Sequence, residues 1–171
     1  MKRYIFLLLL SLPLLWSCKK EEDVSTDGDT PPIFISFQVQ DAEGNDLLNP
    51  ENPNAYGVND IKITCTNLKG DGMEMFYVGA FNGLPEDFGA RFKLEVVTYP
   101  LYGSAPYAIG IMGYDADRNW PKIEAYIDWP DGSQDYIEVH HTFWAGIRQS
   151  HFTTTYYLNG TEVSNPFTIV K

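Results

Sequence analysis

The stretch "IFISFQVQD" (residues 33–41) decides the fold, because its apolar side chains recur at every second position. Successive side chains of a β-strand point to opposite faces, so this alternation is typical of a strand that is buried on one side. The pattern places Ile33, Ile35, Phe37 and Val39 inward and Phe34, Ser36, Gln38 and Gln40 outward. We therefore expect the folded part of the chain to begin with a half-buried strand.

Similar short runs follow, and together they predict an all-β protein. They are "IKITCTN" (61–67), "MEMFYVGA" (73–80), "RFKLEVVTY" (91–99), "YAIGIMGYD" (107–115), "KIEAYIDW" (122–129), "YIEVHHTFW" (136–144), "FTTTYYL" (152–158) and "FTIVK" (167–171). Many short strands separated by Gly, Pro and Asx turns predict an antiparallel β-sandwich of about eight or nine strands. A closed lipocalin-like barrel is the alternative, because glycines in the run 107–115 allow a sheet to bend.

One turn can be assigned in detail. Asn159-Gly160 lies between "FTTTYYL" and "TEV" (161–163). A type I′ turn needs positive φ at both central residues, and Asn and Gly adopt that conformation at least cost. We therefore expect a β-hairpin here.

The N-terminus has the order of a secretory signal. Lys2 and Arg3 precede the apolar segment "YIFLLLLSLPLLW" (4–16), and the small residue Ser17 follows it. A helix that crosses a bilayer core needs roughly 20 residues, so this segment is too short to remain as a span. We interpret residues 1–17 as a signal peptide.

The next residues resemble a known class of signal. "LWSC" (15–18) resembles the lipobox of bacterial lipoproteins, and this resemblance implies that Cys18 is lipidated and that the chain is cut before it. "KKEED" (19–23) resembles the acidic signal that sends lipoproteins of some Gram-negative bacteria to the cell surface. The resemblance implies a lipid anchor in the outer membrane, exposed on the surface, with a periplasm-facing anchor as the alternative.

The remaining chain divides into a tether and a domain. Residues 18–32 are rich in charge, Ser, Thr, Gly and Pro, a composition that cannot form a core, whereas residues 33–171 suffice for a single β-sandwich domain. Without residues 1–17 the chain has 10 basic and 23 acidic residues, a formal charge of −13. Such a charge repels phosphate backbones, so we expect no nucleic-acid partner.

A second resemblance concerns the fold. "DAEGNDLLNPEN" (41–52), which leads toward "DIKIT" (60–64), resembles a loop of small secreted β-sandwich lipoproteins. This resemblance implies an immunoglobulin-like or transthyretin-like sandwich and implies no activity. The loop gathers several acidic residues, but its glycine does not have the spacing of a calcium-binding loop, and we interpret the acids as turn residues.

Cysteine and histidine predict neither metal nor cofactor binding. Cys65 is in phase with Ile61 and Ile63, so we expect it to be a small buried residue rather than a catalytic thiol. His140 and His141 face opposite sides of a strand, so only one of them can join His151 and Glu138 in a site. Nothing in this spacing requires a metal ion.

No catalytic pattern stands out, and we expect a protein that is not an enzyme. The chain lacks the G-x-S-x-G turn of serine hydrolases, and its 23 acids make any carboxylate pair uninformative. Aromatic residues in predicted loops are the best candidates for ligand binding, because their rings can stack on sugars. They are Tyr99, Tyr102, Tyr107, Trp120 and Trp129. The alternative is that these rings cap the ends of the sandwich.

These observations predict a lipid-anchored, non-catalytic binding or assembly module. One alternative is a carbohydrate-binding module of a nutrient-uptake system. Another is a structural subunit of a surface appendage or envelope complex, in which the C-terminal "PFTIVK" (166–171) offers a strand edge to an envelope protein partner.

Overall fold

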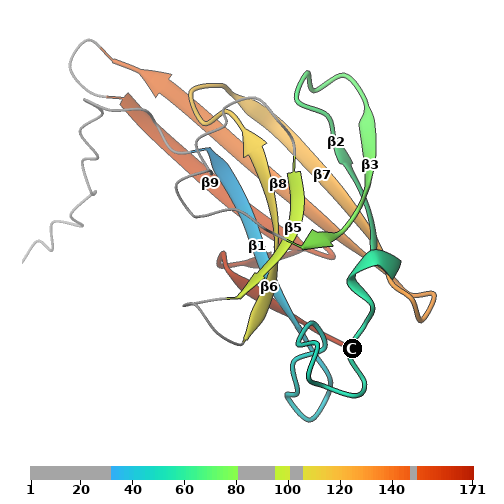
Figure 1. The fold of residues 1–171 in the computed structure, drawn as a ribbon. Coiled ribbons are helices and arrows are strands. Elements are labelled where there is room, and N and C mark those ends of the chain that lie inside the picture. The colour runs from blue at the N-terminus through green and yellow to red at the C-terminus, as the bar shows by residue number, and fades with distance from the viewer. Residues whose placement is uncertain (1–31, 81–94, 101–105, 147–149) are drawn as a thin grey trace, which may run out of the picture.

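Two β-sheets pack face to face in the computed structural model, which describes residues 32–80, 95–100, 106–146 and 150–171 (Figure 1). The five-stranded sheet has the order β11 (Phe167–Val170), β1 (Ile33–Gln40), β6 (Tyr107–Tyr114), β5 (Glu95–Pro100), β4 (Gly79–Ala80). The six-stranded sheet has the order β10 (Thr161–Val163), β9 (Ser150–Leu158), β8 (Gln134–Ala145), β7 (Trp120–Asp128), β2 (Lys62–Thr66), β3 (Met73–Tyr77). A short 3-10 helix, η1 (Val58–Asp60), precedes β2.

The β-sandwich is confirmed, and the barrel alternative is wrong because each sheet ends in two edge strands. The run 73–80 forms two strands, since the chain passes from one sheet to the other at Val78. Residues 91–94 of another predicted run lie outside the described residues.

The strand pairs are not all antiparallel as expected. β11 runs parallel to β1, and β4 runs parallel to β5, whereas the remaining pairs are antiparallel. Between β10 and β11 the chain crosses from the six-stranded sheet to the five-stranded sheet. Such a crossover connection allows β11 to run parallel to its neighbour β1. β11 forms an edge of its sheet, where the sequence predicts an exposed strand.

The core lies between the sheets and follows the predicted alternation. Ile33, Ile35, Phe37 and Val39 are all buried. They face buried residues of the other sheet, among them Ile63, Cys65, Ile123, Ile127, Ile137 and Val139. Cys65 is fully covered, as expected, and burial raises the pKa of its thiol to about 11.

Ser36 is the exception to the outward pattern of β1, because it is buried. Its hydroxyl forms a hydrogen bond with the hydroxyl of Tyr99, which lies on β5. Its backbone N–H donates to the Asn165 side chain at 2.7 Å, and the Asn165 amide donates in turn to the Phe34 carbonyl at 2.7 Å. The Asn165 side chain therefore occupies the place of a neighbouring strand before β11 begins.

The predicted hairpin at Asn159-Gly160 is confirmed. β9 and β10 pair antiparallel across it, with Leu158 opposite Thr161. Asn159 has φ of 49° and Gly160 has φ of 81°, the positive values that a type I′ turn requires.

A buried carboxylate joins the two sheets at the end of the sandwich that contains the C-terminus. The Asp135 carboxylate accepts hydrogen bonds from the Trp129 indole at 2.7 Å and from the Asn159 amide at 2.7 Å, and it pairs with Lys171. We call these four residues the Asp135 network. Burial opposes ionisation, but the hydrogen bonds from Lys171, Asn159 and Trp129 outweigh it and hold the pKa of the Asp135 carboxyl below its ordinary value.

Loss of the Asp135 charge should destabilise the fold. Asp135→Asn leaves the Lys171 ammonium without its counter-ion in a site where both side chains are 11% exposed, and we expect a loss of about 3 kcal/mol in the free energy of unfolding. Urea denaturation of the two proteins measures this difference.

Lys62→Met is the matched control. The Lys62–Asp128 pair has side chains that are 37% and 36% exposed, and solvent screens such a pair, so its loss should lower the free energy of unfolding far less than the loss of the Asp135 charge. If both substitutions lowered the free energy of unfolding by the same amount, burial would not determine how much an ion pair contributes to the stability of this protein.

Candidate functional site

The two tryptophans predicted to bind a ligand are covered in the structure. Trp120 is 2% exposed and Trp129 is 3% exposed. The Arg118 guanidinium lies 4.1 Å from the Trp120 ring centroid, and the Lys171 ammonium lies 4.7 Å from that of Trp129. Their indole N–H groups donate to the Asp115 carbonyl and to Asp135. These rings therefore close the two ends of the core and do not present a face to a ligand.

The predicted tyrosines do not form a common loop site either. Tyr99 lies on β5, is half-buried and bonds to Ser36. Tyr107 begins β6, and its backbone N–H donates to Asp46 at 2.7 Å. Tyr102 lies outside the described residues. Tyr99, Tyr107 and Trp120 therefore lie on strands rather than in the loops expected for them. The hydroxyl of Tyr99 and the indole N–H of Trp120 are already hydrogen-bonded within the protein.

The three histidines and the loop residue Asp41 already have partners within the protein. Both ring nitrogens of buried His141 are used, since Nε2 donates to the Ala116 carbonyl and Nδ1 bonds to Thr154. His140 pairs with Glu138, and His151 stacks on Trp144. The Asp41 carboxylate accepts a hydrogen bond from the Asn45 side-chain amide and others from backbone N–H groups of its own turn, and these bonds hold its pKa below the ordinary value. Within the described residues, no three His, Cys, Asp or Glu side chains gather as ligands for a metal ion.

The outer face of the six-stranded sheet carries the most organised group of polar and aromatic side chains. β7 and β8 turn Ile123, Ile127 and Val139 toward the core, so the residues between them point away from it. The register places Glu124 opposite Glu138 and Tyr126 opposite Tyr136, and Tyr157 of β9 follows beside Glu138. We call the outward residues the Tyr136 cluster: Lys122, Glu124, Tyr126, Tyr136, Glu138, His140 and Tyr157.

Tyr136 connects the two glutamates of this cluster. Its hydroxyl lies 2.8 Å from Oε1 of Glu124 and 2.7 Å from Oε2 of Glu138. Two negative charges directly opposite each other, here Glu124 and Glu138, destabilise a sheet. The hydroxyl that they share and one basic side chain beside each glutamate offset this repulsion. Lys122 pairs with Glu124 at 2.9 Å, and His140 pairs with Glu138.

The aromatic rings are arranged in pairs on the same face. The ring centroids of Tyr126 and Tyr136 lie 4.9 Å apart, and those of His140 and Tyr157 lie 5.5 Å apart. Cross-strand ring contacts and the hydrogen bonds of Tyr136 hold these rings in place. The face therefore combines preordered ring surfaces with carboxylate acceptors.

Both glutamates are held ionised. Hydrogen bonds from Lys122 and then Tyr136 keep the pKa of Glu124 below its ordinary value, and those from Tyr136 and then His140 do so for Glu138. Burial, reinforced by these two carboxylates, raises the pKa of Tyr136. An acid–base pair for glycoside cleavage needs one carboxyl with a raised pKa, and neither glutamate has one. The arrangement suits hydrogen-bond acceptance and ring stacking rather than proton transfer.

No protein-family model, curated protein or solved structure matches this chain. The geometry of the Tyr136 cluster therefore has to be interpreted from its own residues. The sequence contains a signal for it: if "KIEAYIDW" and "YIEVHHTFW" form a hairpin, their outward residues are Glu, Tyr and His on adjacent strands.

Replacement of Tyr136 should change the pKa values of Glu124 and Glu138 by different amounts. In Tyr136→Phe the pKa of Glu138 should rise more than that of Glu124, because Tyr136 is the main stabilising partner of Glu138, whereas Lys122 is the main partner of Glu124. Carboxyl chemical shifts followed by NMR during a pH titration measure both values. Lys122→Met should reverse the order, and equal shifts in both variants would contradict the assigned contacts.

Proposed function

We propose that this protein is a lipid-anchored, non-catalytic binding protein of the outer membrane, exposed at the cell surface, that holds a glycan on the Tyr136 cluster. The observation that carries the proposal is the combination, on one open sheet face, of paired rings with two ionised carboxylates. The C–H face of a sugar stacks on aromatic rings, and its hydroxyls donate to carboxylates.

The charge of the cluster favours a neutral polyhydroxylated ligand over a cation. Lys122 and His140 already pair with the two glutamates, so a cationic ligand would have to displace them. Sugar hydroxyls can share the remaining lone pairs of the carboxylates without breaking those pairs. The position on an extended sheet face also suits a chain of several sugars, because neighbouring strands offer Tyr126, Tyr136 and Tyr157 in sequence.

The anchor is supported by the N-terminal sequence. "LWSC" (15–18) and the short apolar segment before it have the order of a lipoprotein signal. Among the described residues, no helix has the length and hydrophobicity needed to cross a bilayer. Several acyl chains hold a protein stably where one chain binds only marginally.

Mass spectrometry of the native protein tests the anchor. We expect a chain that begins at an acylated Cys18, and we expect Cys18→Ala to lose the acyl mass and to retain residues 1–17. Protease treatment of intact cells tests the surface location, since a periplasm-facing protein is digested only after the outer membrane is broken. An unacylated, uncut wild-type chain would contradict the anchor.

A glycan array followed by calorimetry tests the binding face. Loss of a stacking ring in Tyr126→Ala should weaken the binding of a glycan found on the array about tenfold, which corresponds to roughly 1.4 kcal/mol. Tyr77→Ala is the matched control, because Tyr77 is 61% exposed on β3, outside the cluster. Equal losses in the two variants would rule out the Tyr136 cluster as the site.

Crosslinking of the same purified proteins distinguishes a glycan-binding protein from a structural subunit of a larger assembly. Val170 of β11 is 63% exposed on an edge strand, the place where a partner strand would add. Crosslinked oligomers that disappear in Val170→Lys, together with an array without signal, would favour a structural subunit instead.

A further inference from the structure

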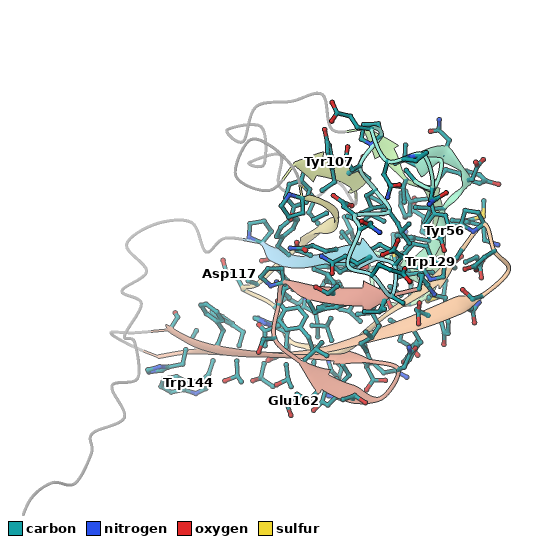
Figure 2. All side chains as sticks on the ribbon, turned by 90° about the horizontal axis from the view of Figure 1, so that it is seen from below. Tyr56, Tyr107, Asp117, Trp129, Trp144 and Glu162 are labelled. Carbon is teal, nitrogen blue, oxygen red and sulfur yellow. The ribbon has the colours of Figure 1, made fainter. Side chains whose placement is uncertain are left out.

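Strands β8 and β9 continue beyond the sandwich at one end (Figure 1). Their paired residues at this end carry aromatic side chains on both faces. Trp144 and His151 are cross-strand neighbours on one face, with ring centroids 5.7 Å apart, and Phe143 pairs with Phe152 on the other. We call these four residues the hairpin tip. Trp144 is 62% exposed and Phe152 is 39% exposed. Figure 2 shows Trp144 far from Trp129, which closes the opposite end of the core.

Exposed rings on both faces distinguish the hairpin tip from an ordinary sheet edge. Strands of an antiparallel sheet usually bury one face and expose polar residues on the other. A protein partner docked on one face would leave the rings of the other face in water. The interfacial region of a lipid bilayer surrounds an inserted hairpin and covers both faces, and Trp is enriched in that region.

The charge of this part of the chain also favours a lipid surface. None of the 23 acidic residues lies between positions 139 and 161, although the chain as a whole has a net charge of −11. All three histidines fall in this stretch. Since the surface of many membranes is negative, an acid-free hairpin is the part of this acidic protein that a bilayer repels least.

The hairpin tip lies at the end of the sandwich where β1 begins. Ile33, the first residue of β1, is paired with Tyr114, and Ala116 just beyond it accepts a hydrogen bond from His141 at the base of the tip. The 14 residues 19–32 that join Cys18 to Ile33 can span at most about 50 Å. Acyl chains on Cys18 would therefore keep the domain within this distance of the bilayer, and the end where β1 begins is the end nearest to Cys18 along the chain.

We propose that the hairpin tip inserts into the headgroup region of the bilayer that holds the Cys18 acyl chains, and so sets the orientation of the sandwich. This inference rests on the proposed lipid anchor. Trp144 and Glu138 are six positions apart on β8, or about 20 Å at the rise of a strand. The headgroup region is only about 5–8 Å deep on each side, so the Tyr136 cluster remains outside it.

Depth-dependent fluorescence quenching tests the inserted tip. The acylated protein is reconstituted into phosphatidylcholine–phosphatidylglycerol vesicles that carry bromine near the headgroup end of their acyl chains. We expect loss of most of the Trp144 emission, while the buried Trp120 and Trp129 keep theirs. Trp144→Phe should remove the quenched component.

Tyr77→Trp in the Trp144→Phe background is the matched control. Tyr77 is as exposed as Trp144. It pairs with Lys62, which in turn pairs with Asp128 at the end of β7 that is opposite to the hairpin tip. Its emission should not be quenched. Quenching at both positions would mean that the domain lies flat on the bilayer, and it would overturn the inference.

Vesicle flotation of the same samples separates this inference from the proposed anchor. Protein that floats without quenching of Trp144 would overturn the inserted tip alone and would favour a protein partner for these rings. Protein that does not float would overturn the anchor and, with it, this inference. Flotation together with quenching only at Trp144 supports both.

Discussion

The buried carboxylate of Asp135 constrains the arrangement of both sheets. Asp135 lies at the start of β8 in one sheet, whereas Lys171 directly follows β11 in the other, so their ion pair joins the two layers. Trp129 and Asn159 donate to the same carboxylate from two separate turns. A charge that is removed from water needs all of these partners, because an unpaired one would cost several kcal/mol. The β7–β8 turn region, the β9–β10 turn and the residue after β11 are thereby tied to one geometry.

The same constraint selects the register that exposes the Tyr136 cluster. With Asp135 turned toward the interior, Tyr136, Glu138 and His140 must point outward, and a slip of one residue would bury all three. Ile137 and Val139, which are fully buried, enforce the same phase by hydrophobic burial. The cluster is therefore a consequence of the core: the side chains that stabilise the sandwich also determine which rings and carboxylates face the solvent.

Local alternation predicts much of this fold, and tertiary contacts explain where it fails. The inward residues of β1, the burial of Cys65 and the Asn159-Gly160 turn follow from periodicity and backbone preference. Ser36 departs from the pattern because Tyr99 and Asn165, far away in sequence, bond to it. The Lys171 ammonium above Trp129 likewise comes from far away in the sequence. The burial of Trp120 and Trp129 depends on packing between the two sheets, which a local pattern does not reveal. The Tyr136 cluster required the pairing of two strands, which a single run does not reveal.

The two ends of the sandwich are closed alike but differ in what projects from them. Trp120 under Arg118 closes one end, and Trp129 under Lys171 closes the other. In the part of the chain that the structure describes, β8 and β9 continue past the core at the first end, where residues 143–145 pair with residues 150–152 (Figure 1). A strand end that only extends into water usually carries polar side chains on both faces. Here the Phe152 ring stacks on buried His141, so the inner face of the overhang still packs on the core. The Trp144 ring on the outer face is 62% exposed, and the proposed insertion into the bilayer accounts for an aromatic ring at this end of the sandwich.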